Sequence, residues 1–198
     1  GPLVRRMPAG HFRLMAMDAI GAQWRHHYQR AIYVNATSSM TSAIAYRQDG
    51  KVTTFNLYQG NFVAQADIHD RLVQLPDGRF QFFDASNEAV ETYMADGHLE
   101  SIRSRSGQTQ TVAYDGCERI AAVTDDFGHS LQFNYDQDCS SASRIYRITS
   151  VVLPDGALIS YGYNAPTGTL ASVTYPGGLV RGYTYGGWNG RLLTGIID

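Results

Sequence analysis

The stretch that decides the fold runs from residue 93 to residue 178 and contains one short pattern four times: YMADGHLESIRSRSG (93–107), YDGCERIAAVTDDFG (114–128), YDQDCSSASRIYRITSVVLPDG (135–156) and YNAPTGTLASVTYPGG (163–178). Each copy opens on a tyrosine, and a fifth copy begins at Tyr185, so that successive tyrosines are 21, 21, 28 and 22 residues apart. The third copy is longer by seven residues, all of them before Ile148. A spacing kept across an insertion indicates a repeat, and a period near 21 is the size of one supersecondary unit stacked on its neighbours.

Each copy also contains an aliphatic pair three residues apart and a turn glycine five residues after that pair. Further glycines, Gly97, Gly168 and Gly190, stand shortly before an aliphatic residue. The shared positions are the tyrosines Tyr93, Tyr114, Tyr135, Tyr163 and Tyr185, the pairs Leu99/Ile102, Ile120/Val123, Ile148/Val151 and Leu170/Val173, and the glycines Gly107, Gly128, Gly156 and Gly178.

The turn chemistry within the repeat predicts antiparallel β-structure. Pairs such as Asp96-Gly97 and Asp115-Gly116 separate runs of five to eight residues that have the length of strands. Aromatic residues alternate within these runs, as Phe133 and Tyr135 do, which places two rings on one face of a strand. The predicted fold is therefore all-β, with stacked antiparallel hairpins that form a curved β-sheet ribbon, and the tyrosines act as spacers between hairpins.

Strand and turn signals extend back from the repeat to about Gly21. Runs of residues at 43–47, 51–58, 61–68, 71–75 and 79–84 read as strands, and the polar segment 35–42 reads as a loop. Residues 28–34 favour a strand by alternation, although the spacing of Trp24 and Tyr28 also fits a helix. We divide the chain into an N-terminal flank (1–17), whose Gly1-Pro2 resembles the remnant of a cleaved tag, a divergent strand-rich part (18–90) and the repeats (91–198).

Composition argues against several classes of function. The net charge of -2 and the pI near 6.3 do not favour nucleic-acid binding, which usually needs a basic surface. No run of apolar residues is long enough to span a membrane. The basic groups Arg103, Arg105 and 25–27 are interpreted as solvated strand faces.

No catalytic constellation is visible. There is no G-x-S-x-G elbow, no phosphate loop and no dinucleotide fingerprint, and the six histidines are scattered. Asp136 and Asp138 offer too few oxygen ligands for calcium, and adjacent His26 and His27 would point to opposite faces of a strand. We therefore predict a protein that is not an enzyme, with no catalytic residues, no metal site and no cofactor.

The two cysteines occupy nearly equivalent positions in successive copies. Cys117 lies three residues after Tyr114, and Cys139 lies four after Tyr135. Equivalent positions in stacked hairpins can come within the Cα separation of a disulfide, about 4.4 to 6.8 Å. The spacing is compatible with a disulfide and equally with two free thiols.

The copies resemble RHS/YD repeats, whose hallmark is Tyr-Asp followed by a turn, a glycine, a leucine and a Thr-Asp-containing turn. Tyr93, Tyr163 and Tyr185 depart from the hallmark, because Met94, Asn164 and Gly186 follow them. The segment 21–28 is similar to one that often opens such repeat regions, through Gly21, Trp24, His26 and Tyr28, with Gln23 where the family usually has glycine. The matching repeat residues are Tyr114-Asp115, Tyr135-Asp136, Val123-Thr124-Asp125, Gly168-Thr169-Leu170 and Gly190-Arg191-Leu192.

The resemblance, which covers residues 18–198, implies a structural function. Long RHS/YD proteins wind a β-sheet ribbon into a hollow shell around a polypeptide, commonly the toxin domain of a bacterial polymorphic toxin, and animal relatives act in adhesion. Five copies are too few to close such a shell. The implied role is a non-catalytic piece of the shell wall of a secreted or cell-surface protein. Its implied partners are the remainder of its parent chain and an enclosed toxin or effector domain, and the strand edges of the fragment predict self-association.

Two other functions remain open from the residues. Exposed aromatic rings on a sheet can stack on sugars, so Tyr183, Tyr185 and Trp188 would serve a module that binds carbohydrate or a cell surface if they form an exposed, coplanar row. A hydrolase with a site built from loops would need a cleft that joins a histidine to Ser140 or Cys139.

Overall fold

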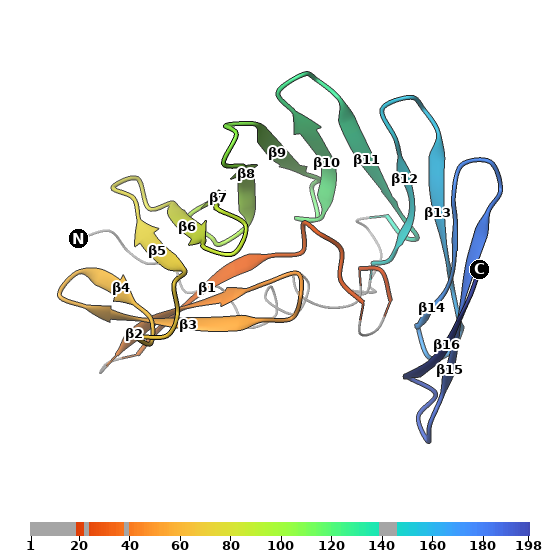
Figure 1. Ribbon diagram of the computed structural model, residues 1–198, viewed down its shortest axis with the longest axis horizontal. Coiled ribbons are helices and arrows are strands. Elements are labelled where there is room, and N and C mark those ends of the chain that lie inside the picture. The colour runs from red at the N-terminus through yellow and green to blue at the C-terminus, as the bar shows by residue number, and fades with distance from the viewer. Residues whose placement is uncertain (1–18, 22–23, 38–39, 139–145) are drawn as a thin grey trace. The chain divides into compact units, whose positions relative to one another are not determined.

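The computed structural model describes residues 19–21, 24–37, 40–138 and 146–198. Within this part of the chain sixteen strands form one antiparallel sheet, in which each strand is followed in space by the next in sequence (Figure 1). The described residues contain no helix, and hence none that is long and apolar enough to cross a membrane. The prediction of an all-β fold built from successive antiparallel hairpins is confirmed.

The strands are short and most are joined by tight turns. Their bounds are β1 (Ala31–Ala36), β2 (Thr41–Tyr46), β3 (Val52–Tyr58), β4 (Asn61–Val63), β5 (Arg71–Gln74), β6 (Phe80–Asp84), β7 (Ala89–Tyr93), β8 (Leu99–Arg103), β9 (Thr109–Tyr114), β10 (Ile120–Asp125), β11 (Ser130–Tyr135), β12 (Ile148–Val152), β13 (Leu158–Tyr163), β14 (Leu170–Thr174), β15 (Val180–Gly186) and β16 (Leu192–Ile197).

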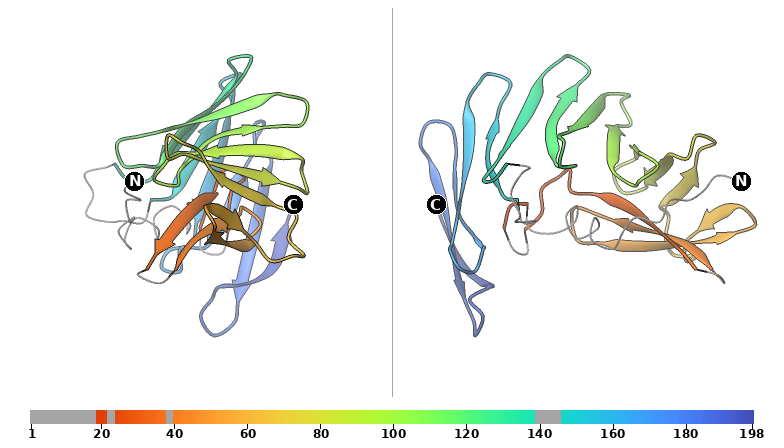
Figure 2. Two further views of the ribbon diagram at one scale, coloured as in Figure 1. Left: turned by 90° about the vertical axis from the view of Figure 1, so that its left-hand side faces the viewer. Right: turned by 180° about the vertical axis from the view of Figure 1, so that it is seen from behind.

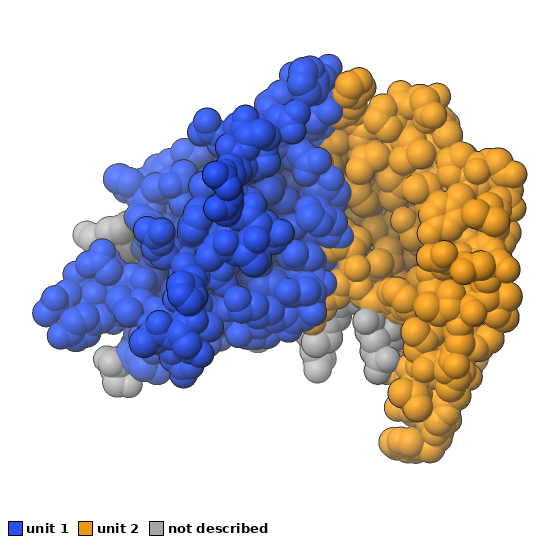
Figure 3. Space-filling view, viewed as in Figure 1, with its two compact units in different colours: residues 1–16, 27–113, 124–128 blue, residues 17–26, 114–123, 129–198 orange. Residues whose placement is uncertain are grey.

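The chain divides into two compact units (Figure 3). Unit 1 comprises residues 1–16, 27–113 and 124–128. The structure describes none of residues 1–16. Unit 2 comprises residues 17–26, 114–123 and 129–198.

The predicted turn glycines close the hairpins. Gly107, Gly128, Gly156 and Gly178 all have φ between +84° and +91°, in the left-handed region that side chains disfavour. The turn between β12 and β13 shows the arrangement. The N–H of Gly156 donates to the carbonyl of Leu153 at 2.9 Å, and the Leu153 N–H donates to Ala157 at 2.8 Å.

A β-bulge beside the tyrosine explains why the aliphatic residues are three apart. Residues three apart on a regular strand face opposite sides of the sheet. In the β11–β12 pair, Tyr135 lies opposite Ile148 and Asn134 lies opposite Ser150, so Thr149 is an extra residue on β12. The extra residue reverses the alternation, and Ile148 and Val151 are both buried. The same shift occurs at Tyr93, Tyr163 and Tyr185.

The core of unit 2 combines repeat strands with the non-repeat segment 19–26. Ile20 is buried in one cluster with Ile148 and Val151, and Trp24 packs against that cluster. The carbonyl of Ala19 accepts the N–H of Ile148 at 2.7 Å, which fixes the segment to the first residue of β12. The repeat strands themselves stand as side-by-side hairpins from β12 to β15 (Figures 1 and 2).

Unit 1 has an aromatic core between β1–β3 and β5–β8. Phe55, Phe80 and Phe82 are fully buried, and the rings of Phe55 and Phe82 meet edge to face with centroids 6.1 Å apart. One edge of β1 pairs with β2, while at the other edge Ala31 bridges His98 in the turn between β7 and β8. The turn thereby covers the start of β1.

Three details of the N-terminal half differ from the sequence prediction. The strand predicted over residues 61–68 is shorter, because β4 ends at Val63. The loop predicted over 35–42 is shorter, because residues 35–36 belong to β1 and residues 41–42 to β2, where they pair with one another. Residues 24–30 form turns and irregular chain rather than a helix, and the strand begins at Ala31. The helix alternative is therefore wrong, and the flank 1–17 lies outside the described residues.

Gly21 provides a test of the segment's docking on unit 2. Its φ is +91°, and a Cβ at this position would lie 2.7 Å from the backbone nitrogen of Leu170. Gly156 has a similar φ of +84° but open space around it. We expect Gly156→Ala to lower the free energy of unfolding by about 1–2 kcal/mol, and Gly21→Ala by about 1–3 kcal/mol more. Urea unfolding curves measure both, and equal losses would contradict the close contact.

Candidate functional site

The aliphatic pairs of the repeat are buried, and two of the repeat tyrosines are tied to the preceding strand. All eight residues of the four predicted aliphatic pairs are buried. The hydroxyl of Tyr135 donates to the carbonyl of Ile120 at 2.8 Å, and that of Tyr163 donates to the carbonyl of Ile148 at 2.6 Å. In both cases the acceptor lies 15 residues earlier and is the first aliphatic residue of the previous copy. Each tyrosine therefore joins two successive copies.

The aspartate of the Tyr-Asp motif completes this link through an arginine. Asp115 accepts the N–H of Cys117 at 2.8 Å and that of Arg119 at 3.0 Å, which closes the turn between β9 and β10. Its other oxygen accepts Nε of Arg119 at 2.7 Å. The guanidinium of Arg119 lies over the ring of Tyr135, 4.3 Å from the centroid. We call this set of aspartate, arginine and following tyrosine a tyrosine clasp.

A second tyrosine clasp follows in the next copy. Asp136 accepts the N–H of Arg147 at 2.9 Å, and the Nε of Arg147 is 3.9 Å from its second carboxylate oxygen. The guanidinium of Arg147 lies over the ring of Tyr163, 5.4 Å from the centroid. The long insertion of this copy lies between Asp136 and Arg147, so the clasp is kept across it.

The fourth copy has a neutral version of the clasp. Asn164 replaces the aspartate and Thr169 replaces the arginine; Nδ2 of Asn164 donates to Oγ1 of Thr169 at 3.0 Å. The tyrosine that follows, Tyr185, has no arginine at the equivalent position, and its hydroxyl accepts the indole N–H of Trp24 at 2.8 Å. Trp24 thus takes over where the arginine is missing.

The tyrosine clasp is a structural device with little chemical reactivity. Burial raises the pKa of both Tyr135 and Tyr163 above that of a free phenol, which keeps their hydroxyls protonated as hydrogen-bond donors. The arginine is held by the aspartate on one side and by the ring on the other, an arrangement that suits a planar guanidinium. The Tyr-Asp motif therefore links one hairpin to the next.

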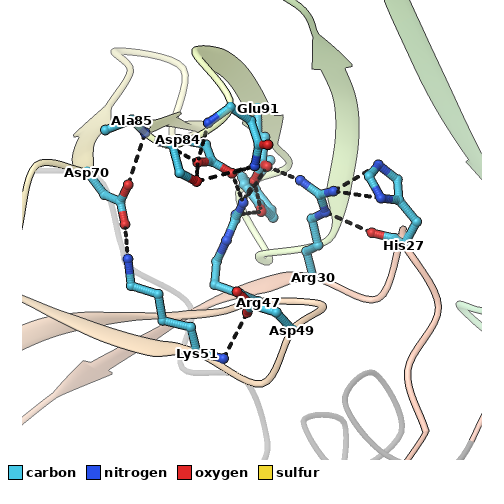
Figure 4. A network of polar contacts seen from close by, with 12 residues as sticks. His27, Arg30, Arg47, Asp49, Lys51, Asp70, Asp84, Ala85 and Glu91 are labelled. Carbon is cyan, nitrogen blue, oxygen red and sulfur yellow. Dashed lines mark hydrogen bonds and ion pairs between the residues drawn. The ribbon is translucent and has the colours of Figure 1, made fainter.

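Unit 1 contains a buried ion network in place of a clasp (Figure 4). Glu91 on β7 is fully buried and binds two arginines: Arg47, which directly follows β2, and Arg30, which directly precedes β1. The Nη2 of Arg47 donates to Oε1 of Glu91 at 2.7 Å and to Oδ2 of Asp84 at 2.8 Å. The hydroxyl of Tyr93 donates to Oε2 of Glu91 at 2.5 Å. Two arginines and two carboxylates leave the network without net charge.

Asp84 connects the network to the turn between β6 and β7. Its Oδ1 accepts the N–H of Ser86 at 3.0 Å and the Ser86 hydroxyl at 2.6 Å, and its Oδ2 accepts Nδ2 of Asn87 at 2.9 Å. Burial by itself would raise the pKa of Asp84, but the hydrogen bonds from Ser86 and Asn87 and the charge of Arg47 outweigh it and lower the pKa to about 2. Asp84 is thus a stably ionised partner for Arg47.

Burial and the network act on Arg47 and Tyr93 as well. Burial would lower the pKa of Arg47, but the hydrogen bonds that Arg47 donates to Glu91 and the nearby negative groups raise it above the usual value. Burial and the negative charge of Glu91 raise the pKa of Tyr93 well above that of a free phenol. The guanidinium of Arg47 also lies 4.3 Å from the centroid of Phe82, which joins the network to the aromatic core.

Sequence reasoning missed this network. Arg30, Arg47, Asp84 and Glu91 come from four separate segments, and no motif connects them. One signal was available: Glu91 lies two residues from both Ala89 and Tyr93 on the same strand. Side chains two apart on a strand share a face, so Glu91 had to face the core with them. A carboxylate at such a position requires a buried cationic partner.

The residues of the predicted opening motif lie in both units. Trp24 and His26 belong to unit 2, where the ring of His26 lies 5.9 Å from that of Phe133. Tyr28 belongs to unit 1, and its hydroxyl donates to Oε1 of Gln110 at 3.4 Å. Gly21 belongs to unit 2 and contacts Leu170. The motif residues therefore have packing and hydrogen-bonding partners within the described sheet.

The three aromatic residues considered for sugar binding do not form a row. The ring of Tyr183 meets that of Trp24 edge to face with centroids 4.9 Å apart, and Tyr185 accepts the Trp24 N–H. Trp188, in the turn between β15 and β16, is 98% exposed. Of the three rings, two are engaged in packing and one is free to meet a ligand.

Of the two cysteines and the serines considered for a hydrolase site, only Cys117 lies within the described residues. Cys117 is disulfide-bonded, as one of the two alternatives requires. Cys139, Ser140, Ser141 and Ser143 lie outside the described residues. Among the residues that are described, no three His, Cys, Asp or Glu side chains gather in a group that could hold a metal ion.

Comparison of the sequence with models of known protein families and with curated proteins finds no match. The resemblance to RHS/YD repeats therefore rests on the motif residues of the sequence alone.

Two substitutions of Tyr135 separate the contribution of its hydroxyl from that of its ring. Tyr135→Phe removes only the hydrogen bond to Ile120 and should lower the free energy of unfolding by about 1 kcal/mol. Tyr135→Ala also removes the ring from under Arg119 and should cost about 3–5 kcal/mol. Tyr58, which is 66% exposed, is the control, and its Phe and Ala variants should lie within about 0.5 kcal/mol of wild type. Urea unfolding provides the values, and a stable Tyr135→Ala variant would contradict the clasp.

The lowered pKa of Asp84 makes the free energy of unfolding depend on pH. Its pKa is about 2 in the folded state and 3.8 as a free side chain, so its contribution is present above pH 4 and is lost as the pH falls from about 4 to about 2. This difference between the two pKa values corresponds to about 2 kcal/mol in the free energy of unfolding. Asp84→Asn should be less stable at neutral pH and should lose less stability over this window, as followed by circular dichroism in urea. Asp155→Asn, in an exposed turn, is the control; parallel curves for wild type and Asp84→Asn would refute the assignment.

Proposed function

We propose that this chain is a non-catalytic structural segment of an RHS/YD-repeat shell that encloses or presents a toxin or effector domain. The observation that carries the proposal is the recurring tyrosine clasp, in which the two residues of the Tyr-Asp motif and an arginine fix one hairpin to the next. A motif used in this way supports a wall made of many hairpins.

The polar groups of the repeat support a structural role in a second way. Asp115 receives three hydrogen bonds from its own turn and from Arg119, and Arg119 also donates to the carbonyl of Gln137 at 2.7 Å. Side chains that are engaged with their own scaffold stabilise it. In this proposal the shell protects its cargo by exclusion, and the parent protein is secreted or displayed at a bacterial cell surface.

Limited proteolysis of the complete gene product that contains this chain tests the proposal. We expect that product to carry a further domain that proteases cleave slowly. Removing one clasp with Asp115→Ala/Arg119→Ala should open the wall and raise the cleavage rate of that domain by about tenfold or more, which corresponds to about 1.4 kcal/mol of easier opening.

The chain offers a matched control. Asp77 and Arg79 also form a turn ion pair, at 2.8 Å, but both are largely exposed. Asp77→Ala/Arg79→Ala should leave the cleavage rate of the further domain near that of wild type. The proposal fails if the gene product has no further domain, or if both double variants change its cleavage equally.

A further inference from the structure

The buried ion network of unit 1 extends outward to His27, which Arg30 contacts (Figure 4). Arg30 is 6% exposed and is held between Glu91 on one side and His27 on the other. Its Nη2 lies 2.9 Å from Nε2 and 3.3 Å from Nδ1 of the imidazole, and its Nε donates to the His27 carbonyl at 2.8 Å. His27 is an exposed residue, so water can reach it. An imidazole titrates near neutral pH, unlike the carboxylates and guanidinium groups of the network.

The contact between His27 and Arg30 requires a neutral imidazole. A guanidinium has only donors, so the ring nitrogen that faces it must be unprotonated in order to accept a hydrogen bond. A protonated ring has an N–H on both nitrogens and a positive charge. It would therefore meet Arg30 donor to donor and cation to cation. The contact and the added proton exclude one another.

The groups around His27 oppose its protonation. Arg30, directly before β1, and Arg47, directly after β2, act on the ring as cations, and Glu91 on β7 is the anion that opposes them. The ring of Tyr28 meets the imidazole edge to face with centroids 5.1 Å apart, and burial keeps this phenol uncharged by raising its pKa. Partial burial, followed by the charge of Arg30, lowers the pKa of His27 below its ordinary value of 6.5.

We propose that His27 is a pH-sensitive latch, which holds Arg30 against Glu91 while the imidazole is neutral and releases Arg30 when it is protonated. Arg30 directly precedes β1 and Glu91 lies on β7, so release of the arginine loosens the attachment of one strand to the other. A protonated His27 also gives the otherwise neutral network a net positive charge. Unit 1 is thereby weakened in mildly acidic solution, while Asp84 is still ionised.

The direction of the pH dependence follows from the lowered pKa of His27. The unfolded chain takes up a proton at this residue at a higher pH than the folded chain does. The stabilising contribution of the neutral imidazole is therefore present above the unfolded-state value of 6.5 and is lost as the pH falls from there through the folded-state pKa.

Urea unfolding at about pH 7.5 and pH 5.5 tests the latch. Between these pH values the unfolding equilibrium constant of wild type should rise by a factor about threefold larger than that of His27→Gln. The amide oxygen of glutamine can accept a hydrogen bond from Arg30 but takes up no proton in this range. His69→Gln, which replaces an exposed histidine of unit 1, is the matched control and should keep the pH response of wild type. Equal responses of wild type and His27→Gln, or a response that His69→Gln reduces as much, overturn the proposal.

Nuclear magnetic resonance of the wild-type chain gives a second readout that needs no variant. The ring protons of His27 should titrate with a midpoint below 6.5. The Nε proton of Arg30, which donates to the His27 carbonyl, should lose its protection from exchange with water at the same midpoint. A His27 midpoint at or above 6.5 contradicts the latch, and so does an Arg30 signal that is unchanged while His27 titrates.

Discussion

The β-bulge beside the repeat tyrosines Tyr93, Tyr135, Tyr163 and Tyr185 is the constraint on which the rest of the repeat depends. Without the extra residue, two aliphatic side chains three apart would face opposite sides of the sheet, and one of them would meet water. With it, both enter the core, and the tyrosine pairs with the first of them, as Tyr163 does with Leu170. The tyrosine hydroxyl then reaches back to the preceding strand, where Tyr163 binds the carbonyl of Ile148. One local irregularity thus sets both the core and the link between copies.

The buried ion network solves a different problem in unit 1. Separating Glu91 from its arginines would leave a charge in an apolar core, a penalty of about 3–5 kcal/mol by analogy with other buried pairs. The network joins residues from the segment before β1, the β2–β3 turn, β6 and β7, so it contributes only when all four segments are in place. A buried network of this kind favours one arrangement of strands over others more than it adds to stability. Its position is consistent with that role, because the divergent half of the sheet has no tyrosine clasp to set its register.

The sequence predicted the hairpins and the repeat because both depend on local chemistry. Turn glycines and aspartates act over four residues, and the aliphatic pairs are recognisable by spacing alone. The bulge could not be derived, because alternation assigns Ile148 and Val151 to opposite faces; only their recurrence marked them as equivalent. The network was hidden for another reason: Arg30 and Glu91 are 61 residues apart, and nothing local distinguishes a buried arginine from a solvated one. The loop at 35–42 was overestimated because small polar residues can also pair at the end of a hairpin.

The non-repeat segment 19–30 supplies what the repeats lack in each unit. In unit 1, Arg30 provides a second cation to Glu91. Without Arg30, the two carboxylates of Glu91 and Asp84 would share the single positive charge of Arg47. In unit 2, Ile20 packs in the cluster around Ile148, and the indole N–H of Trp24 donates to the hydroxyl of Tyr185. The copy before Tyr185 has a neutral Asn164/Thr169 pair in place of the aspartate and arginine. A repeat sheet buries only what its neighbouring hairpins cover. The segment therefore acts as part of the core of both units, and the loss of the Tyr-Asp motif in the last copies is compensated by a tryptophan more than 160 residues away in sequence.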